Sequence, residues 1–298
     1  MKNILCLVLL LVTANLGAQN FKLAGVEYLN YSKVEVEEGM DDQEVSFQEV
    51  NAFVNIPIKF KNQKTVLLNG LRFGLIQTEV FNAPLFSIND NTKNFYRISY
   101  DFTLIHSWSP KWSWMIKLRP TISSDLEENI SSDDFLFLGS TLITRRVSDK
   151  LLIGAGLAYT TQTGDPIFIP VAKLKHETKK NLIDVFFPSY IKYLRKMGQT
   201  GKIQIGAMAA LDGGNFHVTF NEFVPSDPRT IDELIYRRIN VGPTANIKLT
   251  KVLQLELFGG YASGRKFQFS DSADKEIDFD TENGLFFQVG LSITPSKK

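Results

Sequence analysis

Residues 95–122 read FYRISYDFTLIHSWSPKWSWMIKLRPTI, and this stretch decides the fold class. Before the turn at 109–111, aromatic and aliphatic residues recur at every second position from Tyr96 to Trp108. Polar residues occupy most positions between them, with Ile105 the one exception. After the turn the alternation resumes, with Ser113, Met115, Lys117 and Arg119 on one face and Trp112, Trp114, Ile116 and Leu118 on the other. A period of two indicates extended strands, so the stretch predicts a β-hairpin.

The three tryptophans of the chain, Trp108, Trp112 and Trp114, all lie on the apolar face of this hairpin, close to its turn. An indole ring is apolar, but its N–H group favours water, so tryptophan concentrates where a bilayer meets water. We therefore expect the three rings to form a belt at a membrane interface, and the hairpin to span the membrane.

The same alternation recurs along the chain, at residues 50–60, 239–249, 253–261 and 285–293, with weaker faces at 65–80 and 135–146. Membrane barrels prefer even strand numbers, so we expect about fourteen strands, with twelve as the alternative. Residues 181–196 either form two short strands that turn at Pro188 or one long strand with a bulge there.

Two prolines do not fit this pattern. Pro57 and Pro243 fall within predicted strands, where a missing N–H group removes a hydrogen bond that lipid cannot replace. The sequence offers no explanation beyond a local bulge at each.

The connections between the predicted strands alternate in kind. Short turns that carry lysine, such as 61–64, 109–111 and 148–150, alternate with longer segments, of which 35–44, 123–134 and 271–282 are acidic. Short turns at one end and long loops at the other are typical of outer-membrane barrels. The sequence thus predicts an all-β fold, a transmembrane antiparallel up-and-down β-barrel. A secreted β-sandwich is the alternative, but it does not explain such long strands with Arg and Asp in their middle.

The first 18 residues have the features of a secretory signal peptide, namely Lys2, an apolar run and a small-residue end at Gly17-Ala18. We therefore predict a signal peptide at 1–18 and one barrel domain at 19–298. Cys6, the only cysteine, lies within the apolar run, so the mature chain has no disulfide. Loss of Lys2 leaves 32 basic against 32 acidic residues, and this balance argues against a nucleic-acid partner. The mean hydropathy of −0.07 suits a barrel, because alternating faces cancel.

Several local motifs resemble those of an outer-membrane β-barrel domain family of unknown function from Gram-negative bacteria. They are the joint Val147-Ser148-Asp149-Lys150-Leu151, the segments Phe187-Pro188-Ser189 and Ile191-Lys192-Tyr193, and Phe258-Gly259-Gly260-Tyr261. The resemblance covers nearly the whole mature chain. It implies location in the bacterial outer membrane, with the lipid bilayer and lipopolysaccharide and the barrel-assembly machinery as partners. Such families usually end in a strand with a terminal aromatic residue, whereas this chain continues past Ile293 to Lys298.

Catalytic and metal-binding patterns are weak. His106 and Ser107 are neighbours in a strand, so they point to opposite faces and cannot act as base and nucleophile. Neither His176 nor His217 has an Asp or Ser at a sequence spacing that indicates a catalytic pair. We expect no enzyme activity, no cofactor and no resident metal. The acidic segments 123–134 and 271–282 either bind a hard cation such as Ca²⁺ or are solvated loops.

The polar face of the hairpin carries the candidate functional residues, Arg97, Asp101, Lys117 and Arg119. Pairing the two strands places Asp101 opposite or diagonal to Arg119, and Thr103 near Lys117. Such charges inside a barrel either filter solutes by charge or pair off into a neutral plug. We therefore expect a passive conduit for small polar solutes. The alternative is a non-conducting structural or surface-interaction barrel with a filled lumen.

Overall fold

The computed structural model describes residues 21–36, 44–81, 92–222, 229–271 and 276–295, and all its regular elements are strands. The strands are β1 (Ala24–Glu35), β2 (Glu44–Lys59), β3 (Thr65–Phe81), β4 (Thr92–Ser107), β5 (Trp112–Ser124), β6 (Phe135–Ser148), β7 (Leu151–Thr160), β8 (Ile167–Glu177), β9 (Asn181–Phe187), β10 (Tyr190–Met197), β11 (Ile203–Glu222), β12 (Arg229–Lys248), β13 (Leu253–Asp271), β14 (Glu276–Thr281) and β15 (Gly284–Ile293). No helix capable of crossing a membrane occurs within these ranges.

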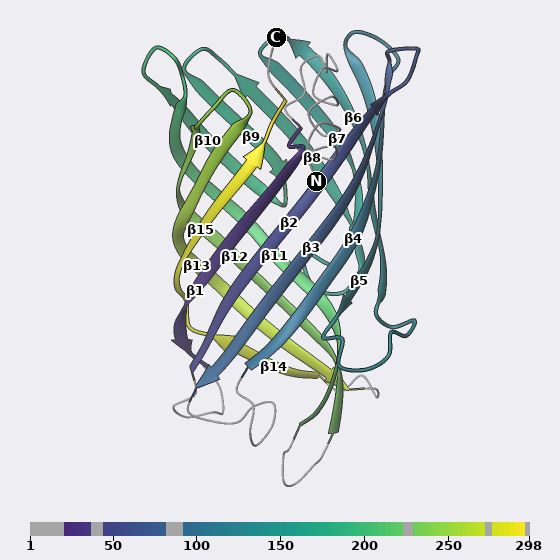
Figure 1. The fold of residues 1–298 in the computed structure, drawn as a ribbon, viewed down its shortest axis with the longest axis vertical. Coiled ribbons are helices and arrows are strands. Elements are labelled where there is room, and N and C mark those ends of the chain that lie inside the picture. The colour runs from purple at the N-terminus through teal and green to yellow at the C-terminus, as the bar shows by residue number, and fades with distance from the viewer. Residues whose placement is uncertain (1–20, 37–43, 82–91, 223–228, 272–275, 296–298) are drawn as a thin grey trace, which may run out of the picture.

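The strands close into one antiparallel barrel (Figure 1). From β1 to β14 each strand pairs with its neighbours in sequence, and β15 pairs with β13 and β1 to complete the circle. Strands β14 and β15 share one position, because both pair with β13, β14 along residues 265–270 and β15 along 253–262. The barrel therefore has fourteen strand positions, which confirms the predicted fold class and strand number.

The outside of the barrel is apolar, as the alternation predicts. In β15, for example, Leu285, Phe287, Val289, Leu291 and Ile293 are exposed, whereas every intervening residue is buried or half-buried. Exposed residues of this kind lie on nearly every strand around the barrel. A sandwich would instead turn this face to a core, so the closed ladder and its apolar outside exclude that alternative.

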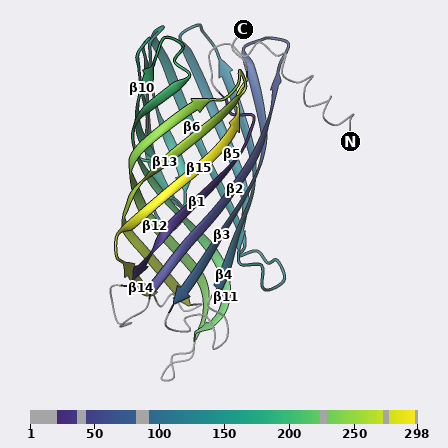
Figure 2. The same cartoon turned by 60° about the vertical axis from the view of Figure 1, so that its left-hand side comes forward.

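The strands differ greatly in length. Strands β9 and β10 have 7 and 8 residues, whereas β11, β12 and β13 have 20, 20 and 19. All strands except β14 reach the end of the barrel that carries the short turns, at the top of Figure 1, but β7–β10 stop well before the end with the long loops (Figures 1 and 2). Beyond them β5 contacts β11 directly, with Ser124 opposite His217 in a parallel pairing.

The barrel consequently narrows along its axis. Near the short turns its wall has fourteen strands, and beyond the β5–β11 contact it consists of β1–β5 and β11–β14. We call these two parts the short-turn half and the long-loop half. About eight strands enclose an interior that side chains can fill, whereas more strands leave a wider lumen.

The pairing explains both misplaced prolines. In β2 the backbone N–H of Asn55 donates to Leu23, so the N–H that Pro57 lacks would point past the start of β1, where no strand lies. In β12 the N–H of Lys248 donates towards β11. Because donor direction alternates along a strand, the missing N–H of Pro243 faces β13. At this point Gly242 and Pro243 are not paired with Gly259 and Gly260 of β13, so the missing N–H of Pro243 removes no hydrogen bond between the strands.

The connections follow the predicted asymmetry where the structure describes them. Pro188 turns two short strands, β9 and β10, rather than bulging one. One expectation is wrong: residues 271–282 are not simply a loop, because 276–281 form β14 against β13. The predicted signal peptide at 1–18 and most of the loop at 35–44 lie outside the described residues.

Candidate functional site

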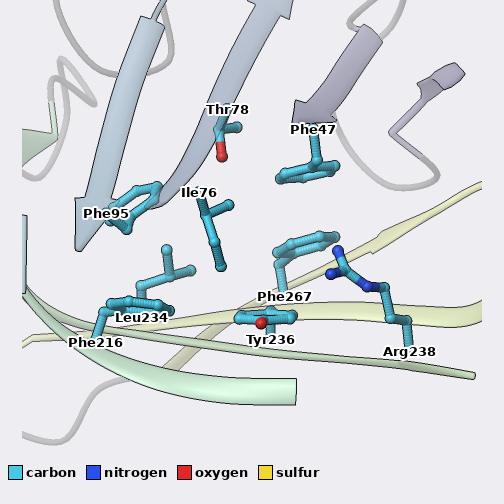
Figure 3. Close-up of a pocket in the computed structure, with 9 residues that line it drawn as sticks. All are labelled: Phe47, Ile76, Thr78, Phe95, Phe216, Leu234, Tyr236, Arg238 and Phe267. Atoms are coloured by element: carbon cyan, nitrogen blue, oxygen red, sulfur yellow. The ribbon is translucent and has the colours of Figure 1, made fainter. Parts of the chain in front are cut away.

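The interior of the long-loop half is filled by aromatic and aliphatic side chains. Phe47 stacks on Phe267 with ring centroids 4.8 Å apart, and Phe95 contacts Phe216 at 5.6 Å. Tyr236 lies between Phe216 and Phe267, at 6.2 and 6.4 Å. Figure 3 shows these rings converging from opposite walls around a narrow hollow, together with Ile76, Leu234 and Arg238. We call this group the aromatic cluster.

A buried ion-pair group borders the aromatic cluster. Arg238 of β12 contacts Glu49 of β2 across the interior and Asp212 of β11 at 2.6 Å. Its guanidinium lies 3.8 Å from the ring centre of Tyr31, whose hydroxyl accepts a hydrogen bond of 2.9 Å from Asn240. The side chain of Arg238 is 1% exposed and that of Glu49 is 6% exposed. This group ties β2, β11 and β12 together, with Arg238 and Glu49 buried and Asp212 34% exposed.

The predicted hairpin residues lie in the wider, short-turn half. Asp101 accepts hydrogen bonds from Arg119 at 2.6 Å and from Arg72 of β3 at 2.5 Å. Lys117 lies 3.3 Å from the same carboxylate and directly opposite Thr103. We call Asp101, Arg72, Lys117 and Arg119 the basic cluster. It contains three positive charges and one negative charge, an excess that pairing alone does not remove.

The sequence did not indicate Arg72, because it lies in one of the weaker strands. Its approach to Asp101 depends on Gly70 of the same strand. A Cβ atom at Gly70 would lie 3.1 Å from the Cβ of Asp101 and 2.4 Å from the side chain of Asn55. The small residue thus leaves room for Asp101 beside Asn55 on this wall.

Arg97 lies further along β4, towards the aromatic cluster. Its guanidinium lies 4.7 Å from the ring centre of Phe216. The Nη2 atom is buried and has no hydrogen-bond partner, and Arg97 forms no ion pair with any described residue. Arg97 therefore adds a fourth positive charge on this wall, between the basic cluster and the aromatic cluster.

Water contact distinguishes the two halves. In the basic cluster Arg72 keeps 37% of its side-chain exposure, Arg119 29% and Lys117 24%, although all three face the interior. The buried Arg238 keeps only 1%. The short-turn half therefore has a solvated, charged interior, and the long-loop half a dry one.

The predicted tryptophan belt lies on the outside, near the turn of the β4–β5 hairpin. Trp108 and Trp112 are exposed and stack with centroids 6.1 Å apart. The indole N–H of Trp114 donates to Thr141 at 3.1 Å, and Arg145 lies over the ring of Trp112. Their contact with lipid remains an expectation.

A contact that the sequence did not reveal closes the side of the barrel between the short strands and the long-loop end. His217 of β11 pairs with Asp134 at 2.9 Å, and Asp125 accepts a hydrogen bond of 2.8 Å from the backbone N–H of Thr219. Ser123 donates to the backbone oxygen of Asn215 at 2.5 Å. We call this group the β5–β11 strap. Residues 134 and 217 are 83 positions apart, so no local spacing could have indicated their pairing.

The strap controls the charge of Asp134. Burial alone would raise the pKa of this carboxyl, but hydrogen bonds from Ser124, the backbone of Ser131 and His217 hold the pKa below its usual value. Two acidic residues of the predicted loop at 123–134 thus hold strands together. Within the described ranges, no three His, Cys, Asp or Glu side chains gather as metal ligands would.

A closed fourteen-stranded barrel with an apolar outside and a charged interior has the architecture of a porin-like outer-membrane β-barrel. A family model described as "Domain of unknown function (DUF6268)" matches residues 14–294, so the chain belongs to that family. No curated protein matches the sequence.

Several solved barrels are similar in structure, at low identity. The Pseudomonas putida toluene transporter TodX aligns at 9% identity and a TM-score of 0.41, over 91% of this chain and 88% of its own. An outer membrane channel from Pseudomonas putida F1 aligns at 9% identity and 0.42, over 94% and 98%. The translocator domain of the autotransporter NalP from Neisseria meningitidis aligns at 12% identity and 0.38, over 98% and 95%.

Proposed function

We propose that this protein is an integral outer-membrane barrel that acts as a channel for small polar solutes. The observation that carries the proposal is the solvated interior of the short-turn half. Arg72, Arg119 and Lys117 face inwards and still contact solvent. Charged side chains that keep their water make a suitable lining for a polar solute.

The aromatic cluster closes the other half in this structure. Phe95 and Phe216 are each 1% exposed, and they pack with Phe47 and Phe267 across the interior. A solute that enters from the short turns therefore meets a dry constriction, and conduction requires the cluster to yield. The same cluster favours the second candidate function, a non-conducting barrel with a filled lumen.

Single-channel recording in planar bilayers separates the two candidates. We expect rare or small steps from the wild type and larger, frequent steps from the double variant Phe95→Ala/Phe216→Ala, which removes two rings of the cluster. The matched control is Phe137→Ala/Phe168→Ala, because those rings are 72% and 75% exposed on the outside. Silence from a folded cluster variant would show that the lumen is filled and would favour the second candidate.

Membrane location has its own test. The protein should fractionate with outer membranes and migrate faster before boiling than after, because a closed barrel resists detergent until its ladders are broken. Recovery in the soluble fraction without a mobility change would contradict the proposal.

The orientation follows from the asymmetry of the connections. A tag inserted in 125–134 should be labelled on intact cells, since long loops of such barrels face outwards. A tag at 148–150 should become accessible only after permeabilisation. The reverse pattern would invert the orientation without affecting the barrel itself.

A further inference from the structure

The distribution of charge inside the barrel indicates which solutes the short-turn half accepts. We infer that the basic cluster and Arg97 form an anion-selective zone, which takes small oxyanions such as carboxylates and phosphates. The inference rests on the proposed channel function and names its substrate class.

The first argument is the local excess of positive charge. Asp101 is the one carboxylate within ion-pair distance of Arg72, Lys117 and Arg119 among the described residues, and it neutralises a single charge. Side-chain exposures of 24% to 37% leave part of each basic group in contact with water. These groups can therefore reach a solute while Asp101 holds them in place.

The second argument is the unsatisfied guanidinium of Arg97. A buried N–H donor without an acceptor is costly, so its partner is expected to be something absent from the folded chain, either water or an anion. The ring of Phe216 beneath this guanidinium fixes the direction of its donors. Planar guanidinium groups match the two oxygens of a carboxylate or phosphate.

The third argument is that the positive excess is local to β3–β5. Elsewhere in the interior, Lys173 pairs with Asp184, Lys196 with Glu177 at 2.8 Å, and Lys22 with both Glu256 at 2.8 Å and Glu27 at 3.5 Å. The acidic excess beside Lys22 lies on β1 and β13 and forms no ion pair with the basic cluster. Unequal charge of this kind sets the ion preference of a pore.

Reversal potentials in a KCl gradient test the selectivity, in both the wild type and the Phe95→Ala/Phe216→Ala background. We expect chloride to permeate about fivefold better than potassium, a preference of the size that one unit charge gives at close range in water. The double variant Lys117→Gln/Arg119→Gln removes the excess of the basic cluster and should bring the ratio towards one. The control Lys196→Gln removes a charge that is already paired, so the ratio should stay within twofold of the wild type. Equal permeabilities for chloride and potassium in the wild type would overturn the inference. So would a loss of chloride preference in Lys196→Gln as large as that in Lys117→Gln/Arg119→Gln.

A binding measurement tests the anion site even where no current flows. At matched ionic strength, replacing sodium chloride by sodium phosphate or sodium acetate should raise the melting midpoint of the folded band by about 2 °C or more. The rise should disappear in Arg97→Gln/Arg119→Gln and persist in Lys196→Gln. Phosphate and acetate together show which oxyanion binds better. A silent channel with this shift intact would reject the channel function but keep the anion site, and no shift with either anion would reject the site.

Discussion

Two inward-facing arginines illustrate the difference between the halves of this barrel. Arg119 and Arg238 both face the interior and both pair with carboxylates, yet their side chains are 29% and 1% exposed. Arg119 lies where fourteen strands enclose the lumen, and Arg238 borders the narrower part beyond the β5–β11 contact. The number of strands in the wall at a given height along the barrel axis thus decides whether an inward-facing charge meets water or other side chains.

Strand length, and not interior composition alone, divides the barrel into a solvated half and a dry half. Shortening β7–β10 lets β5 reach β11, and the resulting ring is small enough for Phe47, Phe95 and Phe216 to fill it. Where all fourteen strands are present, side chains of ordinary size cannot meet across the lumen, so charged groups on the wall remain solvated.

The largest expected effect is the loss of the dry ion pair. Arg238→Ala should destabilise the folded barrel by about 3–5 kcal/mol, because Glu49 is left charged and buried. Arg119→Ala should cost less, about 1 kcal/mol, since Asp101 keeps its other two basic partners, Arg72 and Lys117. Denaturant titration in lipid vesicles measures both values.

The double variant Arg238→Ala/Glu49→Gln is the control for that experiment. It should recover part of the loss, because the buried negative charge is gone. Equal costs for Arg238→Ala and Arg119→Ala would break the comparison between the dry and solvated halves.

A somewhat smaller effect is expected from the lipid-facing side. Leu104→Arg should destabilise folding by about 2–4 kcal/mol, the cost of arginine near the middle of a bilayer. Thr103→Arg should cost less, since residue 103 lies on the polar face that points to the interior and not to lipid. Folding titrations in vesicles compare the two.

Tryptophan fluorescence provides an independent check of the same face. Brominated lipids should quench the emission strongly, because Trp108 and Trp112 are exposed on the outside. If quenching is absent and Leu104→Arg is tolerated as well as Thr103→Arg, the assignment of inside and outside is wrong.

The smallest effect concerns the β5–β11 strap that separates the halves. Asp134→Asn should destabilise the protein by about 1 kcal/mol above pH 5, because it weakens the bonds from Ser124, Ser131 and His217. The pKa of Asp134 is lowered in the folded state, so this stabilisation is fully present above the ordinary pKa of an aspartate and is lost as the pH falls through the lowered pKa. Wild type and variant should therefore converge once the pH is below that lowered pKa, as unfolding titrations from neutral to acidic pH would show. A gap that widened towards acid would contradict the assigned charge.

Much of the architecture followed from local sequence. Alternation with a period of two identified residues 95–122 as a hairpin, assigned Asp101 and Arg119 to one face, and gave the fold class and strand number. These features are local, since side chains two apart share a face whatever the strand pairs with. The sequence left the turn at Pro188 open and did not indicate the strand β14, because short segments contain too few repeats to show a clear period.

The division into a solvated and a dry half was decided only by the tertiary structure. It depends on β5 meeting β11, on Arg72 adding a third basic partner to Asp101, and on His217 reaching Asp134. Each joins residues far apart in sequence, and their meeting depends on strand lengths and register around a closed ring. The sequence determines which way each side chain points, because that is a property of one strand. What the side chain meets inside depends on how many strands surround it, and only the closed barrel sets that number.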